Sequence, residues 1–441
     1  MLRLDIMTED GMTEITETRI QEPEGRRLKT AADHVFDPLD PDTVRNPGPA
    51  YSALARQCPF YHYKGDDYQF YITSDYKEIR DKILSDNPTW SFKWGDAPMD
   101  WETFSDFGIL TDPPFHLEYI AALRKGMTPA RMRYYLPEVE AIAEDLVSGL
   151  EKRADKEGNF HDLFCLPLPA RTMCFMLGAD QALYADYKRW ADELQSLLFN
   201  DKNPSAEQTL IAEIQPHFMG LIEARKQMLR DAGIDEPTHD HWGTVLPFDY
   251  ISLGLVSRVE GRRFNDMELF QICTALLTGG QETTTSLLTN VVWRLLEVPE
   301  RWERLKAEPH LVENVIEESL RFDPPINSHF RTSLCPVQMH GAQLPERSKL
   351  MFSMMGANRD PDIFPDPDSF VMDRPLNQVK RHLSFGYGVH FCLGAPIARL
   401  EAQVGLRKLV ERLPHLRLTG SPERINSWIY WGQRELPVAW D

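Results

Sequence analysis

SFGYGVHFCLG, which spans Ser384 to Gly394, is the most informative stretch of this chain of 441 residues. Three glycines and one cysteine, Cys392, crowd a short loop directly before a predicted helix that starts at Pro396. Glycines let the backbone turn tightly and leave N–H groups free to face the sulfur, and the helix start adds a positive dipole end. Both features favour a thiolate over a thiol. The loop therefore indicates either a single soft metal centre or a buried structural cysteine in a glycine-rich turn.

The charge balance of the chain excludes some partners. Lys and Arg number 48 against 67 Asp and Glu, which gives a net charge of −19. Such a surface repels a phosphate backbone, so no nucleic-acid partner is expected. No apolar run reaches the roughly 20 residues that a membrane-spanning helix needs. The six cysteines show no CxxC pair, which argues against a disulfide scaffold or a structural zinc site. We expect a cytoplasmic protein without membrane contact.

Helical patterns dominate the chain, with short strands early and late, so we expect a mainly α fold. Residues 1–33 are polar and aperiodic and are interpreted as a flexible N-terminal arm. One continuous helix is predicted over residues 266–297, because Asn265 and Asp266 offer a cap and no proline occurs before Pro299. The other predicted elements are helices at 49–56, 75–85, 312–321 and 396–412, helical segments between 115 and 230, a strand at 68–73, and loops at 90–107 and 233–248.

The cysteine loop resembles the haem-binding loop of the cytochrome P450 superfamily, the haem-thiolate monooxygenases. The family pattern Phe-x-x-Gly-x-(His/Arg)-x-Cys-x-Gly is matched by Phe385, Gly388, His390, Cys392 and Gly394. The resemblance covers about residues 34–441 and implies one haem domain with the P450 fold, a helical domain with small β-sheets. It implies haem b as cofactor, with Cys392 as the axial iron ligand, His390 bonded to a propionate, and Phe385 and Gly386 beside the haem.

Glu318 and Arg321 form an i, i+3 pair that is weak evidence by itself, since such pairs are usually solvated. Placed 71 residues before Cys392, the pair resembles the family's Glu-x-x-Arg, which is buried and joined by a downstream arginine. Arg374 is the candidate for that third position. The resemblance implies that this trio is structural.

Gly279 and Gly280 lie in the middle of the predicted long helix, where each glycine costs about 1 kcal/mol relative to alanine. They indicate either a close helix crossing or a place where a ligand approaches the backbone. The segment from Gly279 to Thr283 resembles the oxygen-binding groove of the family. The resemblance implies that Thr283 stabilises bound dioxygen, that Glu282 helps to relay protons, and that Gly279 borders the haem.

His116 and Arg331 are the remaining candidates for haem binding. In the family, a histidine at the place of His116 binds a propionate, and an arginine one helical turn later does the same. Here the later position is Ile120, and Arg124 lies one turn further on the same face. Arg331 matches another propionate arginine of the family. Whether Arg124 compensates for Ile120 is left open.

The substrate pocket is predicted by place from the resemblance. It would be lined by aromatic and apolar segments, which implies a mostly apolar small molecule. The candidate lining residues are Trp94, Phe107, Ala275, Asn327 and Ile429. The paired glycines and the closing residues 436–441 resemble the bacterial camphor-type branch, which favours a terpenoid-sized substrate. A small aromatic acid or phenol ether is the alternative.

A basic stretch interrupts this acidic chain. No acid occurs between Tyr119 and Pro137, whereas Arg124, Lys125, Arg131 and Arg133 are all basic. The stretch is either a solvated face or a docking site for an acidic electron donor, which the resemblance implies to be a ferredoxin or a flavin protein.

We therefore predict a monooxygenase that uses O2 and a ferredoxin to hydroxylate or O-dealkylate a small hydrophobic molecule. A peroxide-driven peroxygenase on the same fold is one alternative. A haem sensor or carrier without turnover is another.

Overall fold

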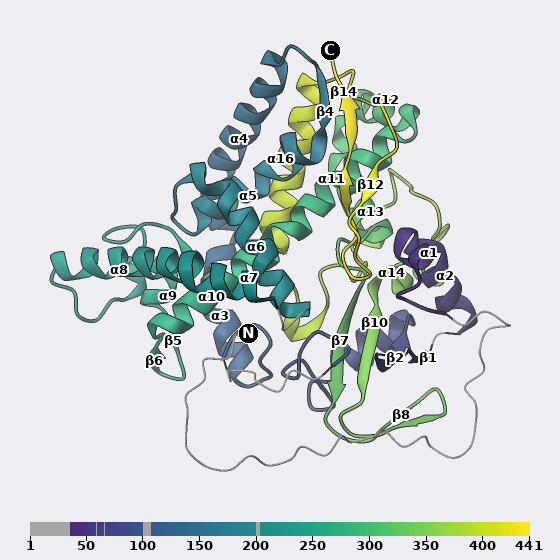
Figure 1. Ribbon diagram of the computed structural model, residues 1–441, viewed down its shortest axis with the longest axis horizontal. Helices are drawn as coiled ribbons and strands as arrows, with labels where there is room; N and C mark the ends of the chain where they lie inside the picture. The colour runs from purple at the N-terminus through teal and green to yellow at the C-terminus, as the bar shows by residue number, and fades with distance from the viewer. Residues whose placement is uncertain (1–35, 59, 66, 100–106, 200–202) are drawn as a thin grey trace.

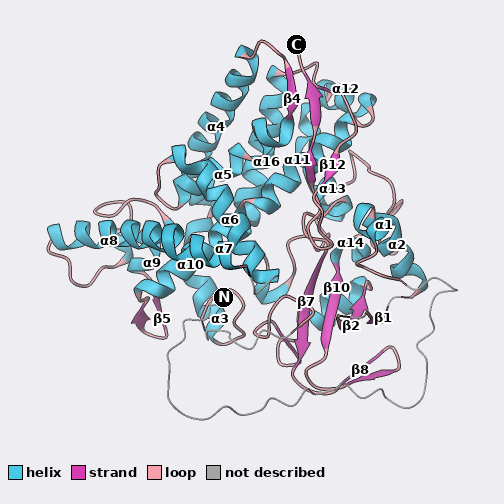
Figure 2. Ribbon diagram, viewed as in Figure 1, coloured by secondary structure: helices cyan, strands magenta, loops and turns pink. Residues whose placement is uncertain are grey.

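The computed structural model describes residues 36–58, 60–65, 67–99, 107–199 and 203–441. The predicted arm at 1–33 and two aromatic residues of the predicted loop, Trp101 and Phe104, lie outside these residues. Helices form most of the molecule, and a sheet lies beside them near the lower right of the view (Figure 1; Figure 2).

The helical elements follow the pattern expected from the sequence. The α-helices are α1 (Pro41–Arg45), α2 (Pro47–Gln57), α3 (Phe115–Arg124), α4 (Pro129–Lys152), α5 (Pro167–Met176), α6 (Tyr184–Phe199), α7 (Pro204–Thr209), α8 (Gln215–Asp231), α9 (Tyr250–Val256), α10 (Asp266–Gly280), α11 (Glu282–Leu296), α12 (Pro299–Ala307), α13 (Val312–Phe322), α14 (Met354–Ala357), α15 (Leu376–Val379) and α16 (Ala395–Arg412). The short 3-10 and π-type helices are η1 (Glu78–Ile83), η2 (Lys125–Met127), η3 (His161–Cys165), η4 (Gln181–Leu183), η5 (Leu210–Ile214), η6 (His239–His241), η7 (Pro309–Leu311) and η8 (Gly388–His390).

The largest sheet of the described chain has the strand order β1-β2-β10-β7-β3. Its members are β1 (Phe60–Lys64), β2 (Gln69–Thr73), β3 (Trp90–Ser91), β7 (Ser328–Ser333) and β10 (Lys349–Ser353). The smaller sheets contain β4 (Glu157–Asn159), β5 (Arg258–Val259), β6 (Arg262–Arg263), β8 (Val337–Met339), β9 (Ala342–Leu344), β11 (Arg417–Leu418), β12 (Glu423–Arg424), β13 (Gln433–Glu435) and β14 (Pro437–Ala439). β7 pairs antiparallel with β10, with His329 opposite Phe352 and Arg331 opposite Leu350.

The predicted helix over residues 266–297 is interrupted, so the expectation of one continuous helix is wrong. α10 ends at Gly280, Gln281 has φ −92° and ψ −65°, and α11 begins at Glu282. The Thr283 hydroxyl donates to the Gly279 carbonyl at 2.7 Å, which is the acceptor that the Thr283 N–H would use in a regular helix. The two interior glycines of the sequence are compatible with a break in the helix. The prediction of one continuous helix relied on the absence of proline and on the cap, and neither of these detects such a break.

The core lies where α11 and α16 meet the surrounding helices. Nearly every side chain of α11 is buried, including polar ones such as Thr285, Thr289 and Asn290. A helix buried all round has no solvent face, so polar side chains on it face other protein groups or a bound ligand. Within the described residues, no helix is both long enough and apolar enough to cross a membrane.

Candidate active site

The cysteine loop is shaped by two glycines that adopt a left-handed backbone. Gly386 has φ +70° and Gly388 has φ +72°, and a Cβ at Gly388 would lie 2.4 Å from the Leu84 carbonyl oxygen. The Cys392 N–H donates to the Phe385 carbonyl at 2.9 Å, which closes the loop. Because side-chain-bearing residues pay strain in this conformation, glycine is required here to bring the loop close to η1.

The sulfur of Cys392 faces backbone donors at the start of α16. Burial raises the pKa of the Cys392 thiol, whereas the N–H groups of Gly394 and Ala395 and the charge of Arg399 act in the opposite direction. The effect of burial is the larger, so the net pKa of the thiol is raised. The prediction that the loop by itself favours a thiolate is therefore wrong. A coordinated cation would displace the proton from such a thiol.

Two histidines meet on one side of this loop. The rings of His116 and His390 lie 3.9 Å apart between centroids, and His116 Nε2 lies 3.3 Å from the Val389 carbonyl oxygen. Burial lowers the pKa of His116 to about 4 and that of His390 to about 2. The Nδ1 atoms of both rings are buried and have no hydrogen-bond partner in the described part of the chain. Such orphaned polar atoms indicate a bound group that supplies their partners.

Arg331 completes this cluster from strand β7. It is 4% exposed, its Nη1 donates to the Phe330 carbonyl at 2.8 Å, and its guanidinium lies over the rings of Phe92 and Phe352. Burial lowers the pKa of Arg331 to about 10. No ion pair to a carboxylate is found for it among the described residues. A buried guanidinium without an ion pair is suited to bind a carboxylate of a ligand. His116, His390 and Arg331 together therefore fit the two propionates of haem.

Ile120 occupies the position at which the family has a second arginine for a propionate, and its surroundings are apolar. Ile120 is 4% exposed and belongs to the hydrophobic core, and Arg124 is exposed one turn further along α3.

Glu282 is buried at the first turn of α11. Its Oε2 lies 2.8 Å from Lys188 Nζ on α6, and its Oε1 accepts from the Ser286 hydroxyl at 3.2 Å. Although burial alone would raise it, the charge of Lys188 holds the pKa of Glu282 below its usual value. The neighbouring Gly279 has open space where a Cβ would stand, whereas a Cβ at Gly280 would lie 2.2 Å from Met173 Cε. The contact of Gly280 with Met173 on α5 therefore fits a close helix crossing, whereas the approach of a ligand at Gly279 stays a prediction.

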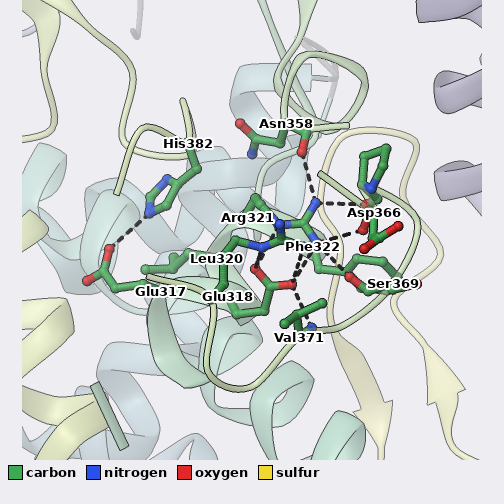
Figure 3. A network of polar contacts seen from close by, with 12 residues as sticks. Glu317, Glu318, Leu320, Arg321, Phe322, Asn358, Asp366, Ser369, Val371 and His382 are labelled. Carbon is green, nitrogen blue, oxygen red and sulfur yellow. Dashed lines mark hydrogen bonds and ion pairs between the residues drawn. The ribbon is translucent and has the colours of Figure 1, made fainter. Parts of the chain in front are cut away.

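Glu318, Arg321 and Arg374 form a buried network. Figure 3 shows the part of it around Glu318 and Arg321. Arg321 donates twice to Glu318, through Nε and Nη2, each at 2.7 Å, and Arg374 Nε donates to Glu318 at 2.9 Å. Arg321 also donates to three backbone carbonyls, those of Asn358, Pro367 and Ser369. The network therefore ties α13 to the segment that leads into the cysteine loop.

The predicted pocket residues lie in different environments. Phe107 packs edge-to-face against Phe115, Tyr119 and Phe264, as a core residue does. The guanidinium of Arg347 lies over the Trp94 ring.

Asn327 and Ile429 are brought together, because the Asn327 N–H donates to the Ile429 carbonyl at 2.9 Å. Asn327 Oδ1 is buried without a partner among the described residues, and Ala275 is half-buried on α10.

Several polar residues of the site were not found from the sequence. Lys188 and Asp192 are spaced i, i+4, but nothing in that spacing points to Glu282, 94 residues away. Asp96, which binds His329, lies in the predicted loop at 90–107, where the sequence gives no sign of this contact. Glu317 binds both His382 and Arg399 beside the cysteine loop. Their partners come from distant segments, so only tertiary structure identifies them.

The helical fold with small sheets and the glycine-bounded cysteine loop are those of a cytochrome P450. The cytochrome P450 family model matches residues 118–432, so the chain belongs to this family.

Its relatives include characterised enzymes. The cytochrome P450 monooxygenase PikC of Streptomyces venezuelae is 30% identical over 426 residues, which is 93% of this chain and 95% of that protein. Erythromycin C-12 hydroxylase of Saccharopolyspora erythraea is 31% identical over 329 residues, covering 74% of this chain and 78% of that protein. The structure of CYP109E1 from Bacillus megaterium in complex with testosterone has a TM-score of 0.75 and 27% identity, covering 90% of this chain and 99% of that chain. The chain is a cytochrome P450 monooxygenase of the bacterial type.

Proposed function

We propose that Cys392 is the axial ligand of a haem b and that the protein hydroxylates or O-dealkylates a small hydrophobic molecule. The observation that supports this most is the cysteine loop, in which backbone N–H groups face the Cys392 sulfur beside two histidines with orphaned nitrogens. Haem bound there would supply the redox chemistry that activates dioxygen, tuned by thiolate donation.

His116, His390 and Arg331 would hold the propionates. All three are buried or half-buried and lie on elements that meet at the loop, and their donors lack strong protein acceptors. Phe385 packs close to the sulfur side, since its carbonyl accepts from the Cys392 N–H and Arg399 lies over its ring.

Glu282 and Thr283 would hold and relay the protons that oxidation chemistry supplied by haem would consume. Glu282 carries the acid and Thr283 the hydroxyl, and the ion pair with Lys188 links Glu282 to the surface. A surface cavity of about 450 Å³ is lined by Lys188, Asp192 and Asp162, so solvent reaches the outer partner of Glu282. This arrangement moves protons while water is excluded from the reaction.

The substrate would be an apolar molecule of terpenoid size, with a small aromatic acid or phenol ether as the alternative. CYP109E1 has been solved with testosterone and with corticosterone, both steroids with a mostly hydrocarbon skeleton. Asn327 would supply a polar anchor through its unpartnered Oδ1.

The electron donor would be an acidic ferredoxin or flavin protein that docks on the basic stretch. Arg124, Lys125 and Arg133 are exposed, and Lys125 Nζ lies 2.8 Å from His239 Nε2. Arg131 is half-buried over the Phe248 and Trp242 rings, so its charge is held close to the surface by aromatic contacts. His116 joins α3, which carries Arg124, to the cysteine loop.

The ligand assignment is tested by replacing Cys392 with alanine and recording the reduced, carbon-monoxide-bound spectrum. We expect the band characteristic of thiolate ligation to disappear in Cys392→Ala and to persist in Cys335→Ala, which changes an exposed cysteine. Persistence of the band in Cys392→Ala would contradict the assignment. Turnover with peroxide alone, at the rate seen with a reductant, would favour the peroxygenase alternative.

A further inference from the structure

His329 and Asp96 form a polar pair close to Arg331. His329 Nδ1 bonds to Asp96 Oδ2, and Asp96 Oδ1 accepts from the Phe330 N–H at 2.6 Å. Although burial alone would raise it, the charges of His329 and Arg331 hold the pKa of Asp96 below its usual value. Asp96 therefore remains a carboxylate and fixes the orientation of the His329 ring.

The loop that carries Asp96 is itself held in place. Lys349 Nζ on β10 donates to the carbonyl oxygens of Trp94 and Gly95, at 2.8 and 3.3 Å. Asp96 is thus anchored on both sides, by β7 through Phe330 and by β10 through the preceding loop.

His329 and Arg331 project from the same face of β7, because they are two residues apart on a strand. They share two aromatic neighbours. Phe92 lies 6.4 Å from the His329 ring and 3.8 Å from the Arg331 guanidinium, and Phe352 lies 6.0 and 5.3 Å from the same two groups. Phe92 also contacts His390 edge-to-face at 5.1 Å. His329 therefore belongs to the same cluster as the proposed propionate ligands.

Since Nδ1 binds Asp96, Nε2 is the ring nitrogen of His329 that is left to bind a further partner. Nε2 has no hydrogen bond within the described residues, and about 26% of the side chain is exposed. A histidine bonded to a carboxylate through Nδ1 presents an N–H donor at Nε2. Haem b carries two carboxylates with several acceptor positions, so it can use a donor in addition to His116, His390 and Arg331.

We propose that His329, oriented by Asp96, is a further binding residue for a haem propionate, and that Asp96 is its positioning residue. This inference rests on the proposed haem site. A donor aimed instead at the substrate would also leave Nε2 free, but the two aromatic neighbours shared with Arg331 favour the propionate edge.

Haem loss to excess apomyoglobin tests the proposal without measuring turnover. We expect His329→Phe to lose haem about tenfold faster than the wild type, as removal of one charge-assisted hydrogen bond predicts. His329→Gln keeps an N–H donor and should stay within about twofold. His62→Phe is the matched control, because His62 is a half-buried histidine stacked on Tyr71 in the same sheet.

Asp96→Asn distinguishes positioning from a general loss of stability. It should accelerate haem loss in the wild-type background and add nothing in the His329→Phe background, since it acts through the ring. Far-UV circular dichroism of the apoproteins shows whether each variant folds. If His329→Phe does not fold, the comparison of His329→Gln with Asp96→Asn decides, because only the second should release haem faster.

Haem loss from His329→Phe at the wild-type rate would overturn the proposal, and a weakened substrate-induced spin shift in that variant would then assign the residue to the substrate. A wild-type protein that binds no haem would instead overturn the proposed function itself, so the two failures are distinguishable.

Discussion

Lys188 on α6 and Glu282 on α11 form a buried ion pair, with Nζ 2.8 Å from Oε2. The two side chains are about equally buried, and Lys188 also bonds to Asp192 at the mouth of the surface cavity. The pair therefore joins the interior acid to solvent through one side chain.

Replacing Lys188 with methionine should leave Glu282 buried without its cation. The pKa of Glu282 should then rise above its usual value, because burial is no longer opposed. We expect product formation to slow by about tenfold or more and the rate to become pH-dependent near neutrality, with a loss of roughly 3 kcal/mol of stability. Lys188→Arg should retain most activity. Lys380→Met, which breaks the exposed pair with Glu313, is the control. A wild-type pH–rate profile in Lys188→Met would contradict the role.

Thr283→Ala should uncouple reductant consumption from product. The hydroxyl donates to the Gly279 carbonyl at the break between α10 and α11, so its loss removes both a proton donor and the contact that holds the break. Product formed per reductant should fall several-fold, as measured by product and hydrogen peroxide yields. Thr283→Ser should preserve the ratio. Thr278→Ala is the control, because Thr278 makes the same kind of backbone contact one turn earlier, to the Thr274 carbonyl. Unchanged coupling in Thr283→Ala would argue against the assignment.

Glu318→Gln and Arg374→Met should destabilise the folded protein strongly. Glu318→Gln leaves two buried guanidinium groups without their carboxylate, and Arg374→Met removes one of the two cations that bind Glu318. Breaking a buried ion pair in this way costs about 3–5 kcal/mol. Chemical unfolding followed by circular dichroism measures the loss. Arg304→Met, which breaks an exposed pair with Asp373, should change stability by less than about 1 kcal/mol. Equal effects of Arg374→Met and Arg304→Met would show that the buried network contributes little.

Glu401→Gln should change the pH dependence of stability. Burial raises the pKa of Glu401 to about 8, so the folded state holds a proton that the unfolded chain releases above its ordinary pKa of 4.5. Wild-type stability should therefore fall as the pH rises from about 4.5 to 8, by roughly 4 kcal/mol from this group. The variant should lack this component and gain relative stability at pH 8. Parallel stability curves for the two proteins over this range would refute it.

Charge reversal of the basic stretch should weaken the binding of the electron donor. Arg124→Glu and Arg133→Glu change exposed side chains, so folding and haem binding should be unaffected. We expect the KM for an acidic ferredoxin to rise about tenfold at low salt and the difference to shrink as salt is added. Arg407→Glu, an exposed arginine on α16, is the control. An equal rise in KM for Arg407→Glu would indicate a general charge effect.

The sequence alone determined the family, the mainly helical fold and the identity of the cysteine loop. These depend on local features: glycines at fixed offsets from Cys392, a cap at Asn265, and apolar periodicity in helices such as α13. Local chemistry of this kind is readable because the residues that act together are neighbours in the chain.

Tertiary structure alone decided which distant groups serve the site. Lys188 and Glu282 are 94 residues apart in the sequence, and Asp96 and His329 are 233 apart. No local sequence pattern at any of these residues predicts the two contacts. The direction of the Cys392 pKa shift likewise depends on burial, which cannot be read from a loop in isolation. Burial sets the energetic cost of each charge, and the partner that offsets this cost is placed by the fold rather than by the local sequence.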